Sequence, residues 1–244
     1  MKKKYSLKIF CDFDGTITLN DVWINSIGRF IKDRESFDKI CDDFYSMKIG
    51  TRECNLRQLA LAENFTPEEF CRYLDEEKTD SSFAEFVKFC RLNDYGLCIV
   101  SSGLDFYIDY ILKREGLDIK FYSSRMIYDR ENKKLSCEFI HTDEYCTLCE
   151  TCKRNILISN TNDLDNEISV YIGDGISDFC VSGFADIVFA KGKLASYCWK
   201  NNITYFDFKD FSDIKNKMEK LAAGRGFKHR QEAKTRRKDI FMGG

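Results

Sequence analysis

The chain has 244 residues, 38 Lys and Arg against 40 Asp and Glu, a formal net charge of −2 at pH 7, and 43% apolar residues. This balance argues against a strongly basic surface for nucleic acid or membranes, and the length allows one large domain or a core with a smaller insertion. No stretch approaches the ~20 apolar residues of a membrane span, and the first apolar run meets Asp12 too soon for a signal sequence. We therefore expect a soluble, cytoplasmic protein without a nucleic-acid or membrane partner.

Short apolar runs predict the buried parallel strands of an α/β fold. Three of them, "SLKIF" at 6–10, "GLCIV" at 96–100 and "ISVYIG" at 168–173, are each bounded by Gly or charge and followed by a helical pattern. Two further strands are expected at 186–190 and 204–208.

Residues 19–82 carry no strand signal and show helical patterns throughout. The clearest helix start is "FTPEEF", with Thr66 as N-cap, Pro67 at the first helical position and Glu69 completing a capping box. We predict an inserted helical domain at 19–82, with the core formed by residues 1–18 and 83–222.

The second half of the chain contains two further predicted features. Residues 125–142 suggest a hairpin with a polar turn near 131–133. The segment 223–244 is basic and loses apolar periodicity, so we expect a solvated, partly disordered end, with an anionic partner as the alternative.

Acidic and small polar residues follow the three central strands. Asp12 and Asp14 come directly after the first, Ser101 ends the second, and Asp174 and Asp178 follow the third in "IGDGISD". Since ligands of such sheets bind at the carboxyl ends of the strands, these residues are expected to act together. A calcium loop of the EF-hand type is excluded because its regular alternate acids and sixth-position Gly are missing.

Together with Lys153, about twenty residues before Asp174, these motifs resemble those of the haloacid dehalogenase-like (HAD) hydrolases. The resemblance spans residues 6–222 and is to the phosphoserine-phosphatase-like branch, in which a helical cap follows the first motif. It implies a Rossmann-like parallel-sheet core with an inserted cap.

A closer resemblance is to the 2-hydroxy-3-keto-5-methylthiopentenyl-1-phosphate phosphatases of methionine salvage. It rests on "CDFDGTITLND", "SSGLDFYI" and "CTLCETCK", although those phosphatases carry Gly where this chain has Ser102.

The resemblance implies a phosphomonoester phosphatase. Asp12 is the expected nucleophile, which forms an aspartyl-phosphate, and Asp14 the acid that protonates the leaving oxygen and then activates water. Lys153 offsets the transition-state charge. The phosphate is expected to lie against the strand-to-helix turn formed by Ser101, Ser102 and Gly103.

The same acids predict a Mg²⁺ site, because Mg²⁺ prefers oxygen ligands. Asp12, the backbone carbonyl of Asp14, and Asp174 are the expected ligands. Asp178 belongs to this group and can also order a water or orient Lys153.

Two charged residues of the predicted cap are candidates for reading the substrate, namely Asp21 and Arg57. If Asp21 and Arg57 pair with an amine and a carboxylate of the substrate, the substrate is phosphoserine. The substrate that we favour is instead a sugar-like phosphate that carries a thioether. Surface charge on a helical cap explains either residue equally well.

Twelve cysteines in a reducing compartment predict thiols or a metal site rather than a disulfide framework. Cys146, Cys149 and Cys152 are spaced by three and lie close to Cys137 and His141. A spacing of three along a helix would place the thiols on one face, so a zinc site, a local disulfide, redox-labile thiols and thiols without a special role all remain open.

Other classes of function also remain. The chain can be a non-catalytic zinc-binding or redox-sensing protein on a phosphatase scaffold, or a phosphotransferase that passes the phosphoryl group to an acceptor other than water. The expected partners are a small phosphorylated metabolite and, for assembly, a second copy in a homodimer.

Overall fold

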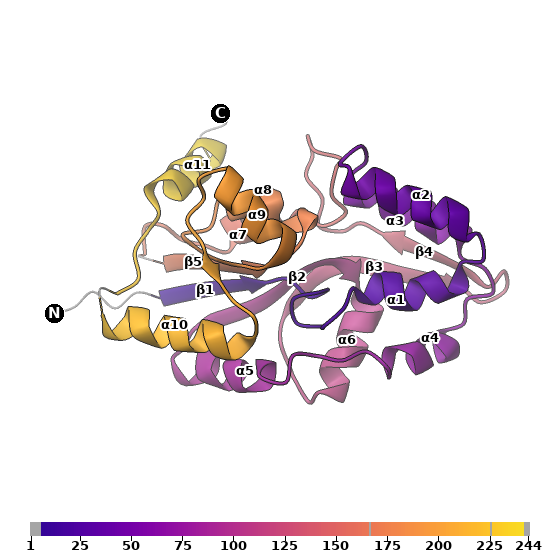
Figure 1. The fold of residues 1–244 in the computed structure, drawn as a ribbon, viewed down its shortest axis with the longest axis horizontal. Coiled ribbons are helices and arrows are strands. Elements are labelled where there is room, and N and C mark those ends of the chain that lie inside the picture. Colours follow the sequence, from indigo (N-terminus) through magenta and orange to yellow (C-terminus); the bar gives the residue numbers. More distant parts are fainter. Residues whose placement is uncertain (1–5, 166, 225, 242–244) are drawn as a thin grey trace. The chain divides into compact units, whose positions relative to one another are not determined.

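The computed structural model describes residues 6–165, 167–224 and 226–241. It forms two compact units (Figure 1). The first comprises the described residues within Met1–Asp12, Thr79–Ile99 and Lys153–Gly244, and the second comprises Phe13–Lys78 and Val100–Cys152.

The first unit is built on parallel strands. Most pairs between β1 and β5 join two apolar residues, for example Ile9 with Val170, which is typical of a sheet covered on both faces. Its strands are β1 (Ser6–Cys11), β5 (Glu167–Gly173), β6 (Ile187–Ala190), β7 (Phe206–Asp207) and the first residues of β2 (Gly96–Leu104).

The helices of the first unit alternate with these strands along the chain. They are α5 (Phe83–Leu92), α7 (Lys153–Ser159), the 3₁₀ turn η2 (Ile176–Asp178), α8 (Phe179–Ser182), α9 (Gly192–Lys200), α10 (Phe211–Ala223) and α11 (Gln231–Phe241). None of the helices in the described parts of either unit combines the length and the apolar character needed to cross a membrane.

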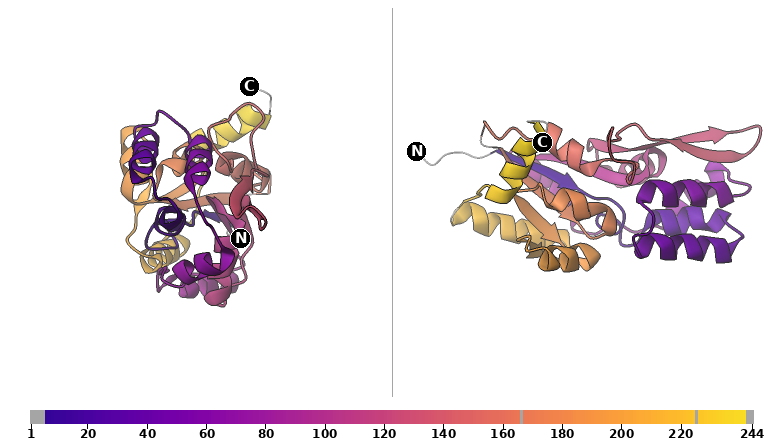
Figure 2. Two further views of the ribbon diagram at one scale, coloured as in Figure 1. Left: turned by 90° about the vertical axis from the view of Figure 1, so that its right-hand side faces the viewer. Right: turned by 90° about the horizontal axis from the view of Figure 1, so that it is seen from above.

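The second unit is largely helical and also contains an antiparallel hairpin. Within it, α2 packs against α3, α3 against β4, and α4 against α6 (Figure 2). Its elements are α1 (Val22–Ser26), the 3₁₀ turn η1 (Ile27–Phe30), α2 (Arg34–Tyr45), α3 (Thr51–Leu61), α4 (Pro67–Leu74), the remainder of β2, α6 (Asp105–Arg114), β3 (Phe121–Asp129) and β4 (Lys134–Glu138).

The predicted α/β fold is confirmed. The residues of β2 belong to both units, and the strands follow the order β4-β3-β2-β1-β5-β6-β7. The hairpin is also present, with Arg125 paired to Glu138 and Asp129 to Lys134, although β3 begins four residues before the predicted segment.

The predicted start of α4 is confirmed as well. The hydroxyl of Thr66 accepts the N–H of Glu69 at 3.3 Å, and Pro67 is the first helical residue. The rings of Phe65 and Phe70 lie 5.3 Å apart and form a hydrophobic staple on either side of the N-cap residue Thr66. The division into a core of 1–18 and 83–222 and a cap of 19–82 stays a prediction.

The basic end is not wholly solvated where the structure describes it. Residues 231–241 form α11, and its Arg237 is completely buried. The guanidinium lies against the partly exposed Asp163 and the buried Asp186, so a cation that looked like solvated charge is paired with two carboxylates. Residues 1–5 and 242–244 of the predicted core and tail lie outside the described residues.

Candidate active site

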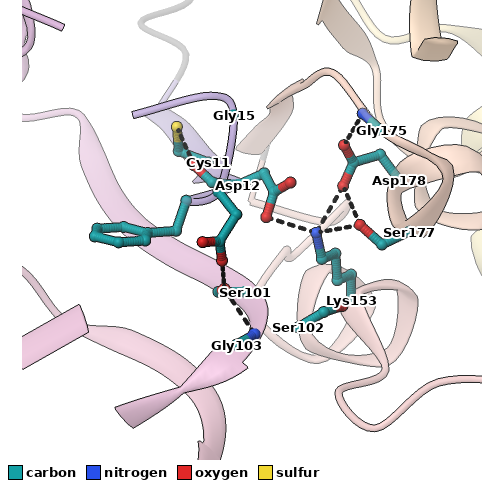
Figure 3. Close-up of polar contacts among 12 residues, drawn as sticks. Cys11, Asp12, Gly15, Ser101, Ser102, Gly103, Lys153, Gly175, Ser177 and Asp178 are labelled. Carbon is teal, nitrogen blue, oxygen red and sulfur yellow. Dashed lines mark hydrogen bonds and ion pairs between the residues drawn. The ribbon is translucent and has the colours of Figure 1, made fainter. Parts of the chain in front are cut away.

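In the first unit, a lysine lies between two carboxylates. Asp12 follows the last residue of β1, where its N–H donates to the carbonyl of Ile172 at 2.9 Å. Lys153 is the first residue of α7. Its Nζ donates to Oδ1 of Asp12 at 2.7 Å, to Oδ1 of Asp178 at 2.7 Å and to the hydroxyl of Ser177 at 3.0 Å (Figure 3).

All three charged groups are buried: Lys153 is 3% exposed, Asp12 5% and Asp178 0%. Burial alone lowers the pKa of Lys153, but the charges of Asp12 and Asp178 outweigh it and raise that pKa. Burial and then the Asp178 charge raise the pKa of Asp12, against the opposing charge of Lys153. The lysine is therefore held as a permanent cation beside Asp12.

Asp178 fixes the loop after β5. Its Oδ2 accepts the N–H groups of Asp174 and Gly175 at 2.9 and 3.0 Å, and its Oδ1 accepts the hydroxyl of Tyr171 at 2.5 Å. A Cβ at Gly173 would lie 2.4 Å from Oδ2, so only glycine permits this approach. The carboxylate is thus committed to protein donors, a geometry that favours a positioning role over direct metal ligation.

The residues present fit a magnesium ion. One carboxylate oxygen from each of Asp12, Asp174 and Asp178 lies within 4.8 Å of the others. Hard oxygen donors are what Mg²⁺ prefers, and Asp174 is partly exposed, which leaves room for the waters that Mg²⁺ retains.

In the second unit, the structure surrounds Asp14 with donors. The hydroxyls of Tyr107 and Ser101 donate to its Oδ2 at 2.6 and 3.3 Å, and the N–H of Val22 donates to its Oδ1 at 3.1 Å. Burial and then the Asp21 charge raise the pKa of Asp14 to about 7, although these hydrogen bonds lower it. A carboxyl of this kind can release a proton near neutral pH.

The residues of the predicted phosphate turn, Ser101 to Gly103, lie at the end of β2, which runs on to Leu104 just before α6. The N–H of Gly103 donates to the hydroxyl of Ser101 at 2.9 Å (Figure 3). The hydroxyl oxygen of Ser102 is buried without a partner among the described residues, and its carbonyl accepts the side-chain amide of Asn55 at 3.4 Å. That unpaired hydroxyl is available to a bound group.

The two predicted cap residues have local partners. Asp21 is the N-cap of α1 and accepts the N–H of Ile24 at 3.0 Å. Arg57 forms an ion pair with Glu53 one turn earlier on α3, and both side chains are about half exposed. Their roles toward a substrate stay predictions.

The cysteine cluster does not form a metal site. The backbone N–H of Cys152 donates to the carbonyl of His141 at 2.6 Å, but no disulfide joins any of the twelve cysteines, all of which lie in the described residues. Two groups of three or more potential ligands converge in the parts of the chain that are described, and neither contains a cysteine; they are Asp12, Asp174 and Asp178, and Asp163, Asp186 and His229. The zinc and disulfide alternatives therefore have no support in the structure.

Sequence reasoning missed three hydroxyl groups, those of Tyr107, Tyr171 and Ser177. A detectable signal existed for Tyr171, because a tyrosine inside a buried strand needs a partner for its hydroxyl, and it lies two residues before Gly173 on the same face. The partner of Tyr107 lies 93 positions away in sequence, where no local pattern connects the two.

Comparisons with known proteins agree with this geometry. The family model described as haloacid dehalogenase-like hydrolase matches residues 9–182. Proteins named 2-hydroxy-3-keto-5-methylthiopentenyl-1-phosphate phosphatase, one from Bacillus cereus and one from Bacillus anthracis, are 29% identical over 221 residues, which cover 88% of this chain and 97% of each relative. A protein of the same name from another Bacillus cereus strain is 30% identical over 224 residues.

The fold resembles those of solved phosphoserine phosphatases. A phospho-aspartyl intermediate analogue of that enzyme matches with a TM-score of 0.67 and 21% identity over 88% of this chain and 99% of the other. A substrate-bound complex matches with a TM-score of 0.66 and 23% identity over the same shares. The comparisons confirm the predicted class of enzyme, a phosphatase, and the chain belongs to the haloacid dehalogenase-like hydrolase family.

Proposed function

We propose that the protein is a Mg²⁺-dependent phosphatase of a small cytosolic phosphomonoester and works through an aspartyl-phosphate on Asp12. The observation that carries this proposal is the Lys153 ammonium, held 2.7 Å from a buried carboxylate oxygen of Asp12. A carboxylate that attacks a phosphate dianion faces like-charge repulsion, and a fixed cation offsets it.

The reaction has two halves. Asp12 attacks phosphorus while the bond to the ester oxygen breaks. Asp14, which is two residues after Asp12 in the chain, gives its proton to that oxygen. Asp14 then takes a proton from the water that hydrolyses the aspartyl-phosphate. Lys153 offsets the charge on the transferring group in both halves.

Magnesium belongs to the same proposal. Asp12, Asp174 and the backbone carbonyl of Asp14 would hold it, while Asp178 fixes Lys153 and the loop that carries Asp174. Bound there, the ion supplies positive charge that balances the phosphate and the surrounding carboxylates.

For the substrate we favour one like that of the methionine-salvage relatives. These relatives cover nearly the whole chain at 29–30% identity, whereas the phosphoserine phosphatases support the fold alone. A phosphoserine substrate needs a cation for its carboxylate, and Arg57, the predicted one, already pairs with Glu53.

The test is Mg²⁺-dependent phosphate release across a panel of small phosphomonoesters. The panel contains the methionine-salvage intermediate, phosphoserine, sugar phosphates, glycerol 3-phosphate and p-nitrophenyl phosphate, with Asp12→Asn as the blank. We expect release that disappears in Asp12→Asn and is fastest for the methionine-salvage intermediate. Faster release from phosphoserine would replace the substrate assignment, and no release from any ester by the folded protein with Mg²⁺ would overturn the function.

A further inference from the structure

The hydroxyl of Tyr107 is placed directly on the carboxyl group of Asp14. Tyr107 lies in the first turn of α6 and is completely buried. Its ring packs against Phe13 and Phe70, at centroid distances of 6.1 and 6.4 Å. Because the ring is enclosed, its hydroxyl has little freedom, and it donates to Oδ2 of Asp14 at 2.6 Å.

The chain at Gly103 is shaped to allow this contact. A Cβ at that position would lie 1.6 Å from the Tyr107 hydroxyl oxygen, 2.3 Å from Cζ and 3.1 Å from Oδ2 of Asp14. Any side chain at 103 would therefore displace the hydroxyl. The absence of a side chain at Gly103 is thus a condition for the bond between Tyr107 and Asp14.

The hydrogen bonds divide the two oxygens of Asp14 into different roles. A carboxylate oxygen has two lone-pair positions, and those of Oδ2 face the hydroxyls of Tyr107 and Ser101. Oδ1 accepts one hydrogen bond, from the N–H of Val22. The second lone-pair position of Oδ1 is the one that the hydrogen bonds of the described residues leave open for a proton.

We propose that Tyr107 is a positioning residue for Asp14, whose hydroxyl holds Oδ2 so that Oδ1 carries and delivers the proton to the leaving oxygen. The inference rests on the proposed function and adds to it a residue outside the recognised motifs. It also assigns the proton to one oxygen of the acid. If Asp14 served only as the hydrogen-bond partner of a buried tyrosine, Tyr107→Phe would not affect an alkyl ester more than an aryl ester.

The discriminating readout is the dependence on the leaving group. An alkyl phosphate expels an alkoxide and needs a proton from Asp14, whereas p-nitrophenyl phosphate expels a stable phenolate that needs none. The quantity to compare is kcat/KM, because it covers the steps through departure of the leaving group. The alkyl ester is glycerol 3-phosphate or whichever alkyl phosphate of the panel the wild type cleaves fastest.

We expect Tyr107→Phe to lower kcat/KM by about 10- to 100-fold for the alkyl ester and by less than about threefold for p-nitrophenyl phosphate. Tyr110→Phe is the matched control, since its hydroxyl lies on the same helix and donates to Asp75 at 2.7 Å. We expect it to change neither value. In an Asp14→Asn background, Tyr107→Phe should cause no further loss, because the two residues act as one unit.

Equal losses for both esters, no loss, or losses that add to those of Asp14→Asn would each overturn the positioning role. Thermal unfolding of each variant identifies an equal loss that comes from damaged folding. No phosphate release by the wild type from either ester would overturn the proposed function, and the inference with it.

Discussion

The Nζ of Lys153 and Oδ1 of Asp12 lie 2.7 Å apart, although 141 positions separate the two residues in the chain. Both side chains are almost completely buried, where an unpaired charge is costly. The same Nζ also donates to Asp178, so one cation serves two carboxylates. Asp178 in turn holds the backbone N–H groups of the loop, which fixes the lysine from its far side.

Replacing Lys153 by Met should therefore lower kcat/KM by about 10²- to 10³-fold, because a preorganised charge on the transferring group is lost. The loss should be similar for alkyl and aryl phosphates, since Lys153 acts on the phosphoryl group and not on the leaving oxygen. Steady-state kinetics with both esters is the measurement. Lys8→Met is the control, because Lys8 makes a partly exposed ion pair with Glu167. A loss no larger than in this control would contradict the role of Lys153.

The second prediction concerns pH. Asp14 acts as an acid in its protonated form, and burial followed by the Asp21 charge raises its pKa to about 7. Activity toward an alkyl phosphate should therefore be present below pH 7 and fall up to about tenfold per unit above it, as the proton is lost. The measurement is the pH profile of kcat/KM.

The fall in activity above pH 7 should be absent with p-nitrophenyl phosphate, and for the alkyl phosphate it should disappear in Asp14→Asn. An alkyl phosphatase activity that keeps rising well above neutral pH would rule out Asp14 as the acid.

Much of the fold could be predicted because its physical causes are local. Buried parallel strands require continuous apolar runs such as "ISVYIG", and a capped helix start has a fixed residue order, as at Thr66 and Pro67. The acids at strand ends could be identified for the same reason. Asp12 and Asp174 follow their strands directly, where the sequence alone shows a break from apolar to charged residues.

The remaining features depend on contacts between distant parts of the chain. The hydroxyl of Tyr107 meets Asp14 only after folding, and the carboxylate partners of Arg237 lie 51 and 74 positions away. In the cysteine segment, a cysteine at every third residue would place the thiols on one face of a helix. No helix is formed at 146–152, so the sulfurs do not converge. Spacing predicts a cluster only where the backbone is regular.

The third prediction is metal binding at the loop after β5. Asp174→Asn should weaken Mg²⁺ binding by at least about tenfold, since it removes a charged ligand. Asp165→Asn is the matched control on an exposed turn of the same unit. Isothermal titration calorimetry with MgCl₂ measures the affinity without relying on turnover; equal affinities for the two variants would place the metal elsewhere.

The fourth prediction concerns α11 and the free energy of unfolding. The Arg237 guanidinium donates to Asp163 at 3.0 Å, to both oxygens of Asp186 at 3.1 Å and to the hydroxyl of Ser169 at 3.2 Å. Arg237→Met leaves the buried Asp186 and the partly exposed Asp163 without this cation and should lower the free energy of unfolding by about 3–5 kcal/mol, as measured by urea unfolding. Lys238→Met, one residue on and exposed, should change it by less than about 0.5 kcal/mol. Equal effects would mean that α11 is held by its apolar contacts rather than by this buried ion-pair network.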